Sequence, residues 1–284
     1  MSATAIEIEP LAGALGARVH GVDLARPLDA AAERTIRAAL DRHLLICFPG
    51  QHLAEPEHIE FSRRFGALQV HVLDQYRHPR HPEIYVLSNV DPKTDRPTGT
   101  HPDRGTLVWH SDLSFQARPA FLTILYGREV PRGGHATLYA DMRAAYDALE
   151  PALQARLADL RAIHDLDHSR RRAGEPPMSE AQRRAAPPVE HPVVRRDPAT
   201  GRKSLYVSYH VAGFAGLPEA EGHALLETLI AHATDARFTL AYRWAPRDVV
   251  VWDNRWTMHC ATGYDTGAER RVIHRTVVLG DAPQ

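Results

Sequence analysis

The chain has 284 residues, 44% hydrophobic and 24% charged, with a formal net charge of −1 at pH 7. This composition is typical of a globular domain with a sizeable core. A near-neutral chain lacks the basic field that drives nucleic-acid binding, and no run approaches the ~18 apolar residues of a membrane span. The two cysteines are too few for a disulfide framework, which fits a reducing compartment. We expect one cytoplasmic domain over residues 1–284, assembled as a homo-oligomer (dimer or tetramer), with neither nucleic-acid nor membrane partners.

Apolar residues follow helical spacing in some stretches and form short runs rich in β-branched residues in others. In chain order the sequence predicts a helix over 29–41, a strand at HLLICF (43–48), a helix over about 55–65, strands at EIYVLS (83–88) and AFLTILY (120–126), a helix over about 142–161, a strand at SLYVSY (204–209), a helix over 218–233, and strands at DVVVW (248–252) and RTVVLG (275–280). We therefore expect helices that flank a mainly β core.

Two long segments, 89–107 and 168–203, are rich in Pro, Arg, Asp, Gly and Thr. Both exceed the usual length of a connection between elements, and such segments are commonly functional or mobile. We interpret them as loops that cover an active site. Plain surface insertions are the equal alternative.

Histidine and carboxylate residues two positions apart suggest a metal site. A non-haem iron(II) oxygenase binds its metal through two imidazoles and one carboxylate and leaves the other positions open. In an extended segment alternate side chains share a face, so a His-x-Asp pair can reach one ion. Four pairs have this form: His58/Glu60, His81/Glu83, His101/Asp103 and His110/Asp112.

The surroundings of the four pairs differ. The first lies in a predicted helix, where residues two apart do not share a face. In the second and third, a Pro follows the His in a turn-like stretch, which is typical of a solvated loop histidine. The fourth lies between the apolar stretches LVW (107–109) and LSF (113–115), which predicts a partly buried extended segment.

The second histidine should come from another strand near the C-terminus. His259 follows the apolar DVVVW run closely and is the favoured candidate. His274, inside a strand-like run, is the competitor and could equally be a hydrogen-bonded structural residue. Spacing alone favours His110, Asp112 and His259 without excluding the alternatives.

The chain resembles the taurine dioxygenase and 2,4-dichlorophenoxyacetate dioxygenase family over nearly its whole length. The similarity is carried by GVDLARPL (21–28), FPGQ (48–51), FSRRFG (61–66), WHSDLSF (109–115), EVPRGGHATLYADMRAAYDAL (129–149), HPVVR (191–195), GRKSLYV (201–207), VWDNRWTMH (251–259) and RRVIHRTVVLGD (270–281). The resemblance implies a double-stranded β-helix (jelly roll). It also implies Fe(II) held by His110, Asp112 and His259, with 2-oxoglutarate and O2 as cosubstrates.

The resemblance also implies binding roles. Arg271 matches the residue that holds the far carboxylate of 2-oxoglutarate, and Thr137, in a GGHAT stretch where relatives often have GGDT, matches the residue that assists it. Arg275 and His71 match positions that bind an anionic group of the primary substrate. Thr106 replaces a substrate-site Asn. If RVIHR is extended, the two arginines Arg271 and Arg275 share one face.

We therefore expect a dioxygenase that hydroxylates a small anionic substrate and releases succinate and CO2, with fragmentation of the product. An alkyl sulfonate such as taurine, or an alkyl sulfate ester, is the expected substrate, and a phenoxyalkanoate is the alternative. Asp74 and Thr106 depart from the taurine enzymes, which have an aromatic residue and an Asn there. From other classes, a zinc hydrolase or a non-catalytic barrel that binds small acids would be compatible with the same ligands.

Overall fold

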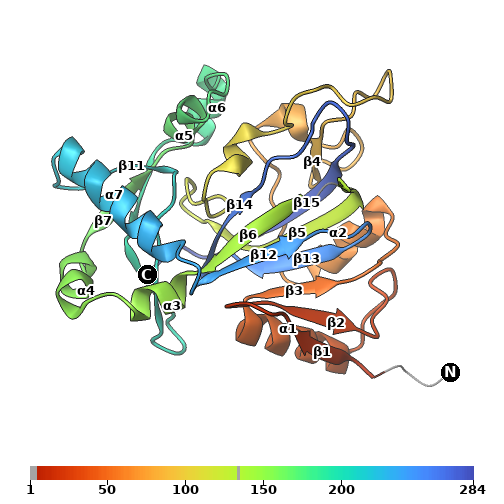
Figure 1. The fold of residues 1–284 in the computed structure, drawn as a ribbon, viewed down its shortest axis with the longest axis horizontal. Coiled ribbons are helices and arrows are strands. Elements are labelled where there is room, and N and C mark those ends of the chain that lie inside the picture. The colour runs from red at the N-terminus through yellow and green to blue at the C-terminus, as the bar shows by residue number, and fades with distance from the viewer. Residues whose placement is uncertain (1–4, 133–134) are drawn as a thin grey trace.

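Strands form the centre of the molecule, and helices lie around them (Figure 1). The computed structural model describes residues 5–132 and 135–284. Gly133 and Gly134 of the GGHAT stretch lie outside the described residues. Two sheets that face each other make up the part of the fold that carries the predicted site.

The larger sheet combines strands from both ends of the chain, in the order β1-β2-β3-β13-β5-β15-β4. Neighbours are antiparallel except β2 and β3, which are parallel. The central strand β13 is buried along its whole length, which explains its continuous run of β-branched residues. The bounds are Glu7–Pro10 (β1), Ala17–His20 (β2), Leu45–Phe48 (β3), Tyr85–Ser88 (β4), Ala120–Glu129 (β5), Val249–Asp253 (β13) and Val272–Leu279 (β15).

The smaller sheet is antiparallel and has the order β12-β6-β14. Tyr139 of this sheet and Trp244, which directly follows one of its strands, pack with Trp252 and Ile273 of the larger sheet in one buried cluster. Burial of side chains of this size stabilises the fold by about 1.5–3 kcal/mol each. The two facing sheets form a jelly roll, which confirms the predicted fold class. The strands are Ala136–Asp141 (β6), Thr239–Arg243 (β12) and Thr257–Ala261 (β14).

Two helices cover the outer face of the larger sheet: α1 (Ala30–His43) and α2 (Glu55–Arg63). The carboxylate of Asp29 caps α1 by accepting a hydrogen bond from the amide of Ala32 at 2.8 Å. Ile36 of α1 and Phe61 of α2 pack against Val249 and other residues of the sheet. Both predicted helices, 29–41 and 55–65, are confirmed within a few residues.

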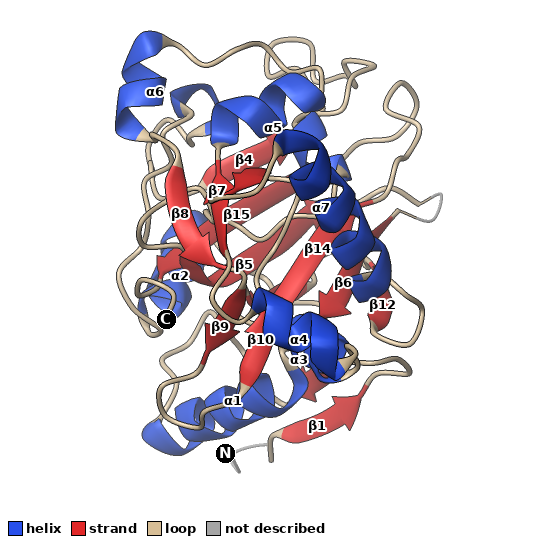
Figure 2. Ribbon diagram, turned by 90° about the vertical axis from the view of Figure 1, so that its left-hand side faces the viewer, coloured by secondary structure: helices blue, strands red, loops and turns tan. Residues whose placement is uncertain are grey.

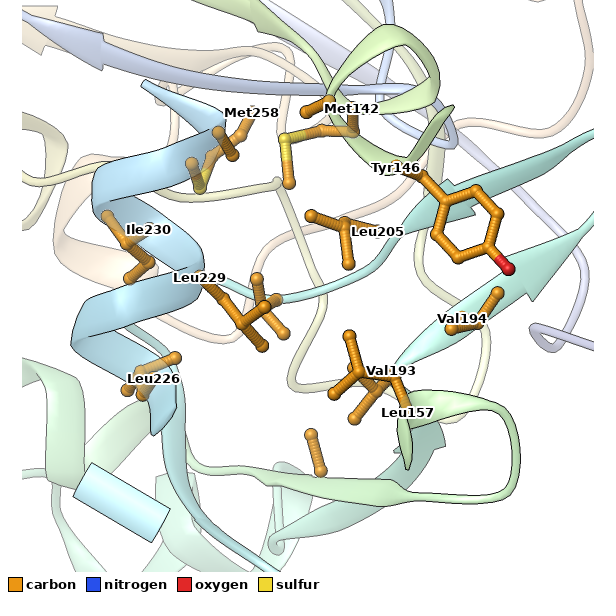
Figure 3. Packing of buried hydrophobic residues seen from close by; sticks show 14 of the residues in the cluster. Met142, Tyr146, Leu157, Val193, Val194, Leu205, Leu226, Leu229, Ile230 and Met258 are labelled. Carbon is orange, nitrogen blue, oxygen red and sulfur yellow. The ribbon is translucent and has the colours of Figure 1, made fainter. Parts of the chain in front are cut away.

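A second group of elements lies beside the jelly roll, on the left in Figure 1, and includes the long helix α7. Figure 3 shows Leu229 of α7 pointing toward Val193 and Leu205 in a separate buried cluster. The view in Figure 2 shows α7 and α5 on one side of the strands and α1 below them. The helices are Met142–Asp147 (α3), Pro151–Leu157 (α4), Leu166–Arg172 (α5), Glu180–Ala185 (α6) and Glu219–Ala233 (α7), and the strands are Arg161–His164 (β7), Val189–Pro192 (β8), Val194–Arg196 (β9), Lys203–Leu205 (β10) and Val211–Phe214 (β11).

Two predicted elements are wrong in extent. The helix expected over 142–161 is two helices, because Pro151 has no amide hydrogen and disfavours helical geometry in the residue before it. The strand expected at 204–209 ends at Leu205: the amide of Tyr206 still bonds to the carbonyl of Val193, but the amide of Tyr209 bonds instead to the carbonyl of Trp109.

The two predicted loops also differ. Segment 89–107 is a loop that ends in a 3-10 helix, η2 (Arg104–Leu107). Segment 168–203 contains most of α5 and all of α6, β8 and β9. Ser179 and Gln182 form a capping box that starts α6, a helix signal hidden in the Arg- and Pro-rich composition.

Candidate active site

His110, Asp112 and His259 meet at the edge of the smaller sheet. Their potential ligand atoms lie within 4.8 Å of one another, and all three residues are buried. His259 lies on β14, and the backbone amides of His110 and His259 donate to each other's carbonyls at 2.8 Å. The structure thus brings together the three residues that spacing favoured.

The His110–Asp112 segment is not the extended strand expected from sequence. Only one bridge joins it to β14, after which the chain turns, and Leu113 adopts a left-handed conformation with φ of 55°. The turn aims Asp112 back at the two imidazoles. Asp112 therefore shares a site with His110 because of a bridge followed by a turn, and not because of strand alternation.

Three residues fix the Asp112 carboxylate. Thr123 Oγ1 donates to its Oδ2 at 2.6 Å, and Arg275 Nη1 donates to its Oδ1 at 3.0 Å. Asn254 accepts from the Asp112 amide at 3.1 Å and donates to Thr123 at 2.9 Å. Burial raises the pKa of Asp112, but the charge of Arg275 and the hydrogen bond from Thr123 outweigh it and hold this pKa below its usual range. The carboxylate is therefore ionised.

The two imidazoles present free nitrogens to this carboxylate. His110 Nδ1 donates to the carbonyl of Val108 at 2.8 Å, so its Nε2 keeps a lone pair. Burial holds the pKa of His259 well below its usual range, so this ring is neutral. The Nε2 atoms of His110 and His259 lie 3.9 and 3.6 Å from the carboxylate oxygens of Asp112, too far for hydrogen bonds. The ligand atoms of these three residues converge but do not bond to one another, which is the arrangement expected around a bound cation.

Two cavities meet at the three candidate metal ligands. Thr106, His110 and Arg275 line both cavities. The first is also lined by His71, Leu73, Tyr85, Asp103, Leu113, Phe115, Leu166, Arg170 and His210. The second is also lined by Leu87, Leu125, Thr137, Trp252, His259, Ala261 and Arg271. The cation position therefore lies where two small molecules could approach from different sides.

The second cavity contains a buried arginine without a counter-charge. Arg271 is 2% exposed, and its Nη1 has no hydrogen-bond partner in the described part of the chain. Burial lowers the pKa of Arg271 to about 10, which still leaves the guanidinium charged at neutral pH. Thr137 Oγ1 accepts a hydrogen bond from Trp244 Nε1 at 2.9 Å. An uncompensated buried cation favours an anionic ligand.

The first cavity contains Arg275, whose guanidinium lies 4.2 Å from the ring centre of Tyr85. Arg275 Nε has no partner among the described residues. Burial, and then the charge of Arg275, hold the pKa of His71 well below its usual range, so His71 is neutral. Thr106 reaches both cavities, but its hydroxyl donates to the carbonyl of Asp103 at 2.7 Å.

The competing histidines lie elsewhere. His274 is on the outer face of β15, near His58 and His78, while Arg271 and Arg275 share the inner face as expected for an extended RVIHR. His101, predicted to be solvated, is partly buried, with its ring 5.7 Å from that of Tyr264.

Sequence reasoning missed several residues of the site. His210 and Arg170 line the first cavity, but no motif marks them. Asn254 and Thr123 hold Asp112 in place. Asn254 directly follows a strongly apolar strand, and Thr123 lies within one. A buried polar residue inside such a run was the available signal, because it requires a hydrogen-bond partner.

Two buried imidazoles and a carboxylate inside a jelly roll, beside a cavity with an arginine that has no ion-pair partner among the described residues, are typical of the class of non-haem iron oxygenases. Residues 7–277 match the model of the "Taurine catabolism dioxygenase TauD, TfdA family". The chain belongs to this family.

Individual relatives agree with the family match. The chain is 38% identical over 291 residues to the "Alpha-ketoglutarate-dependent 2,4-dichlorophenoxyacetate dioxygenase" of Cupriavidus pinatubonensis, with 99% of each chain covered. It is 31% identical to the "Alpha-ketoglutarate-dependent sulfate ester dioxygenase" of Pseudomonas putida, covering 98% of this chain and 91% of that one. The crystal structure of AAD-2 in complex with Mn(II) and N-oxalylglycine superposes with a TM-score of 0.84 at 32% identity and 99% coverage of both chains.

The protein is therefore a 2-oxoglutarate-dependent dioxygenase that uses Fe(II), 2-oxoglutarate and O2. The zinc hydrolase and the non-catalytic barrel, which the ligand set alone allowed, do not agree with this family membership.

Proposed function

We propose that His110, Asp112 and His259 hold the iron. The support is the donor set itself: a neutral ring at His259, a free Nε2 at His110, and an ionised carboxylate fixed by Thr123. Bound iron supplies the activation of O2 that couples decarboxylation of 2-oxoglutarate to hydroxylation of the substrate. The residues around the metal exclude bulk water and keep the carboxylate oriented.

The second cavity is the proposed site of 2-oxoglutarate. Arg271 offers a buried guanidinium with a free Nη1 for the far carboxylate. Because Thr137 Oγ1 already accepts a hydrogen bond from Trp244, its own hydrogen is available to donate to the same carboxylate. Both residues line the cavity that reaches His110 and His259, so a dicarboxylate held here would extend toward the metal.

The first cavity is the proposed site of the primary substrate. Arg275 presents a buried positive charge at the end next to Asp112, and it is the proposed partner of the anionic group of the substrate. His71 and Thr106 border the same space, where they would contact the substrate near its anionic end. The remaining lining combines an apolar and aromatic wall with the polar or charged Asp103, Ser169, Arg170 and His210; the wall consists of Leu73, Tyr85, Val108, Leu113, Phe115 and Leu166.

We propose an aryloxyalkanoate as the best-supported substrate class. The observation that carries this proposal is the apolar wall opposite the buried guanidinium of Arg275, which suits an acid with an aromatic body. An alkyl sulfate ester is the second candidate, because its alkyl chain suits the same wall and the Pseudomonas putida relative is named for such esters. Taurine, with two carbons and a cationic amine, would leave the apolar wall without a contact.

Hydroxylation of the carbon that bears the ether or ester oxygen determines the products. One oxygen atom from O2 enters the substrate C–H bond and the other enters succinate. The hydroxylated carbon then expels its aryloxy or sulfate group and becomes a carbonyl. An aryloxyacetate would thus give a phenol and glyoxylate.

A succinate-release assay over aryloxyalkanoates, alkyl sulfates and taurine tests the substrate class. We expect kcat/KM for an aryloxyacetate to exceed that for taurine by a factor of about 10 or more, because each buried CH2 equivalent contributes about 0.8 kcal/mol. Equal or higher kcat/KM for taurine would contradict the role assigned to the apolar wall.

Segments 89–107 and 168–203 are proposed to cover the substrate cavity. Thr106 of the first segment and Arg170 of the second line it, and Glu175 joins the two: its Oε1 accepts from the Arg104 amide at 2.9 Å, and its Oε2 lies 3.8 Å from Arg170. One acidic side chain thus connects both segments.

The Glu175→Ala substitution tests this connection. We expect KM for the primary substrate to rise about 5- to 20-fold, as for the loss of one charge-assisted hydrogen bond, with an unchanged KM for 2-oxoglutarate. Glu180→Ala, on α6 of the same segment and paired with exposed Arg184, is the control and should have wild-type constants. An equal effect of both substitutions would argue against a link through Glu175.

Other partners were predicted to be absent. Within residues 5–132 and 135–284, none of the helices is both long and apolar enough to cross a membrane. The expected lack of nucleic-acid partners and the expected homo-oligomer stay predictions.

A further inference from the structure

Arg271 has a neighbour to which the proposed function assigns no role. Its Nε donates a hydrogen bond to His135 Nε2 at 3.1 Å, and both residues are 2% exposed. A guanidinium can only donate, so His135 Nε2 must carry a lone pair and its hydrogen must be on Nδ1. That Nδ1 lies 3.1 Å from the carbonyl of Thr262, which can only accept. The two contacts therefore define one tautomer of His135.

The electrostatic surroundings keep His135 in this neutral form. Burial, and then the positive charge of Arg271, lower the pKa of His135 to about 3. In the described residues, no carboxylate lies within ion-pair distance of Arg271. Arg271 is therefore held by a neutral acceptor, which leaves its charge uncompensated.

The backbone fixes His135 beside the cavity. Thr262 bonds to the flanking residue Ala136 in three ways: Oγ1 accepts from its amide at 2.8 Å, while the Thr262 amide and hydroxyl donate to its carbonyl at 2.9 and 3.1 Å. His135 precedes β6 and Thr137 lies in it, so the two side chains lie on the same face of an extended segment. Ala136 lies between them on the other face.

The contact to Nε restricts how Arg271 can bind a carboxylate. A guanidinium binds a carboxylate through two parallel N–H groups, either along the Nε side or between the two terminal nitrogens. His135 occupies the Nε side. The terminal pair, whose Nη1 has no partner in the described part of the chain, is the edge that stays available.

We propose that His135 is a positioning residue for 2-oxoglutarate: its neutral imidazole accepts from Arg271 Nε and turns the two terminal nitrogens of the guanidinium toward the far carboxylate. This inference rests on the proposed role of Arg271 in cosubstrate binding. It assigns the His of GGHAT a function of its own, separate from that of Thr137.

The test measures binding of 2-oxoglutarate by anaerobic calorimetry with Mn(II) in place of Fe(II), so that it does not depend on turnover. We expect His135→Leu to weaken binding about 10-fold or more, as for the loss of a hydrogen bond to a charged group. His135→Gln should recover most of the affinity, because its Oε1 can accept from Arg271 Nε. In steady state, KM for 2-oxoglutarate should rise in His135→Leu, while kcat at saturating cosubstrate and KM for the primary substrate stay near wild type.

Two further variants separate the possible failures. His232→Gln is the control, because His232 is also partly buried and bonded to a carbonyl, that of Ala145, but lies on α7 away from both cavities; it should bind 2-oxoglutarate like wild type. Arg271→Gln should weaken binding more than His135→Leu. If Arg271→Gln binds normally, the proposed cosubstrate site itself is wrong. If Arg271→Gln loses affinity for 2-oxoglutarate while folded His135→Leu does not, the positioning role is overturned. It is also overturned if His135→Gln binds 2-oxoglutarate as weakly as His135→Leu does.

Discussion

Replacing Asp112 by alanine is expected to abolish dioxygenase activity and to lower the affinity for Fe(II) by a factor above about 100, the loss that removing even an outer partner of a metal ligand can cause. The same substitution leaves the buried charge of Arg275 without its partner, which costs about 3–5 kcal/mol in the free energy of unfolding. Fe(II) titration under anaerobic conditions, succinate release and thermal unfolding measure the three effects.

Asp112→Asn and His81→Ala complete this experiment. Asparagine keeps the size of the side chain and should spare more of the stability than alanine, yet it removes the ionised ligand and should also be inactive. His81 belongs to one of the competing His-x-Glu pairs, lies outside both cavities and should tolerate alanine. Near-normal iron affinity in Asp112→Asn would contradict the assignment of this carboxylate.

Arg275→Gln is expected to raise KM for the primary substrate by about 100-fold or more, because a bidentate contact to an anion comprises two hydrogen bonds to a charged group at about 1.5–3 kcal/mol each. Affinity for 2-oxoglutarate should change far less, because its far carboxylate is assigned to Arg271. Steady-state constants for each substrate, measured with the other saturating, distinguish the two.

Arg270→Gln is the matched control. Arg270 directly precedes Arg271, but its side chain is partly exposed and bonds to Glu129 and Asp95. An exposed pair contributes about 0–1 kcal/mol, so both KM values should stay close to wild type. If Arg270→Gln and Arg275→Gln had the same effect on the substrate KM, a general electrostatic influence would explain it better than a specific contact.

The sequence was sufficient to predict the positions of those strands that are buried on both faces. β5 and β13 contain long, mainly apolar runs, and both were predicted close to their observed bounds. The smaller sheet was missed, because β6, β12 and β14 mix polar residues such as Arg243 and His259 with apolar ones. Their partners are distant in sequence, and local spacing carries no information about that pairing.

In the site, too, some features could be predicted from local sequence and others depend on contacts between distant residues. His-x-Asp spacing and apolar context indicated His110 and Asp112, although the chain there turns and is not a strand. The partners of Asn254 and His135 could not be predicted from local sequence, because each contacts a residue that is far away along the chain: Asn254 contacts Asp112, and His135 contacts Arg271. Hydrogen bonds of this kind depend on tertiary packing, which the jelly roll alone supplies.

Visible absorption after anaerobic addition of Fe(II) and 2-oxoglutarate tests the metal centre most directly. Wild-type protein should develop a weak charge-transfer band that requires both additions, and folded His110→Ala should show none. A band of undiminished intensity in His110→Ala would contradict the placement of iron at His110, Asp112 and His259.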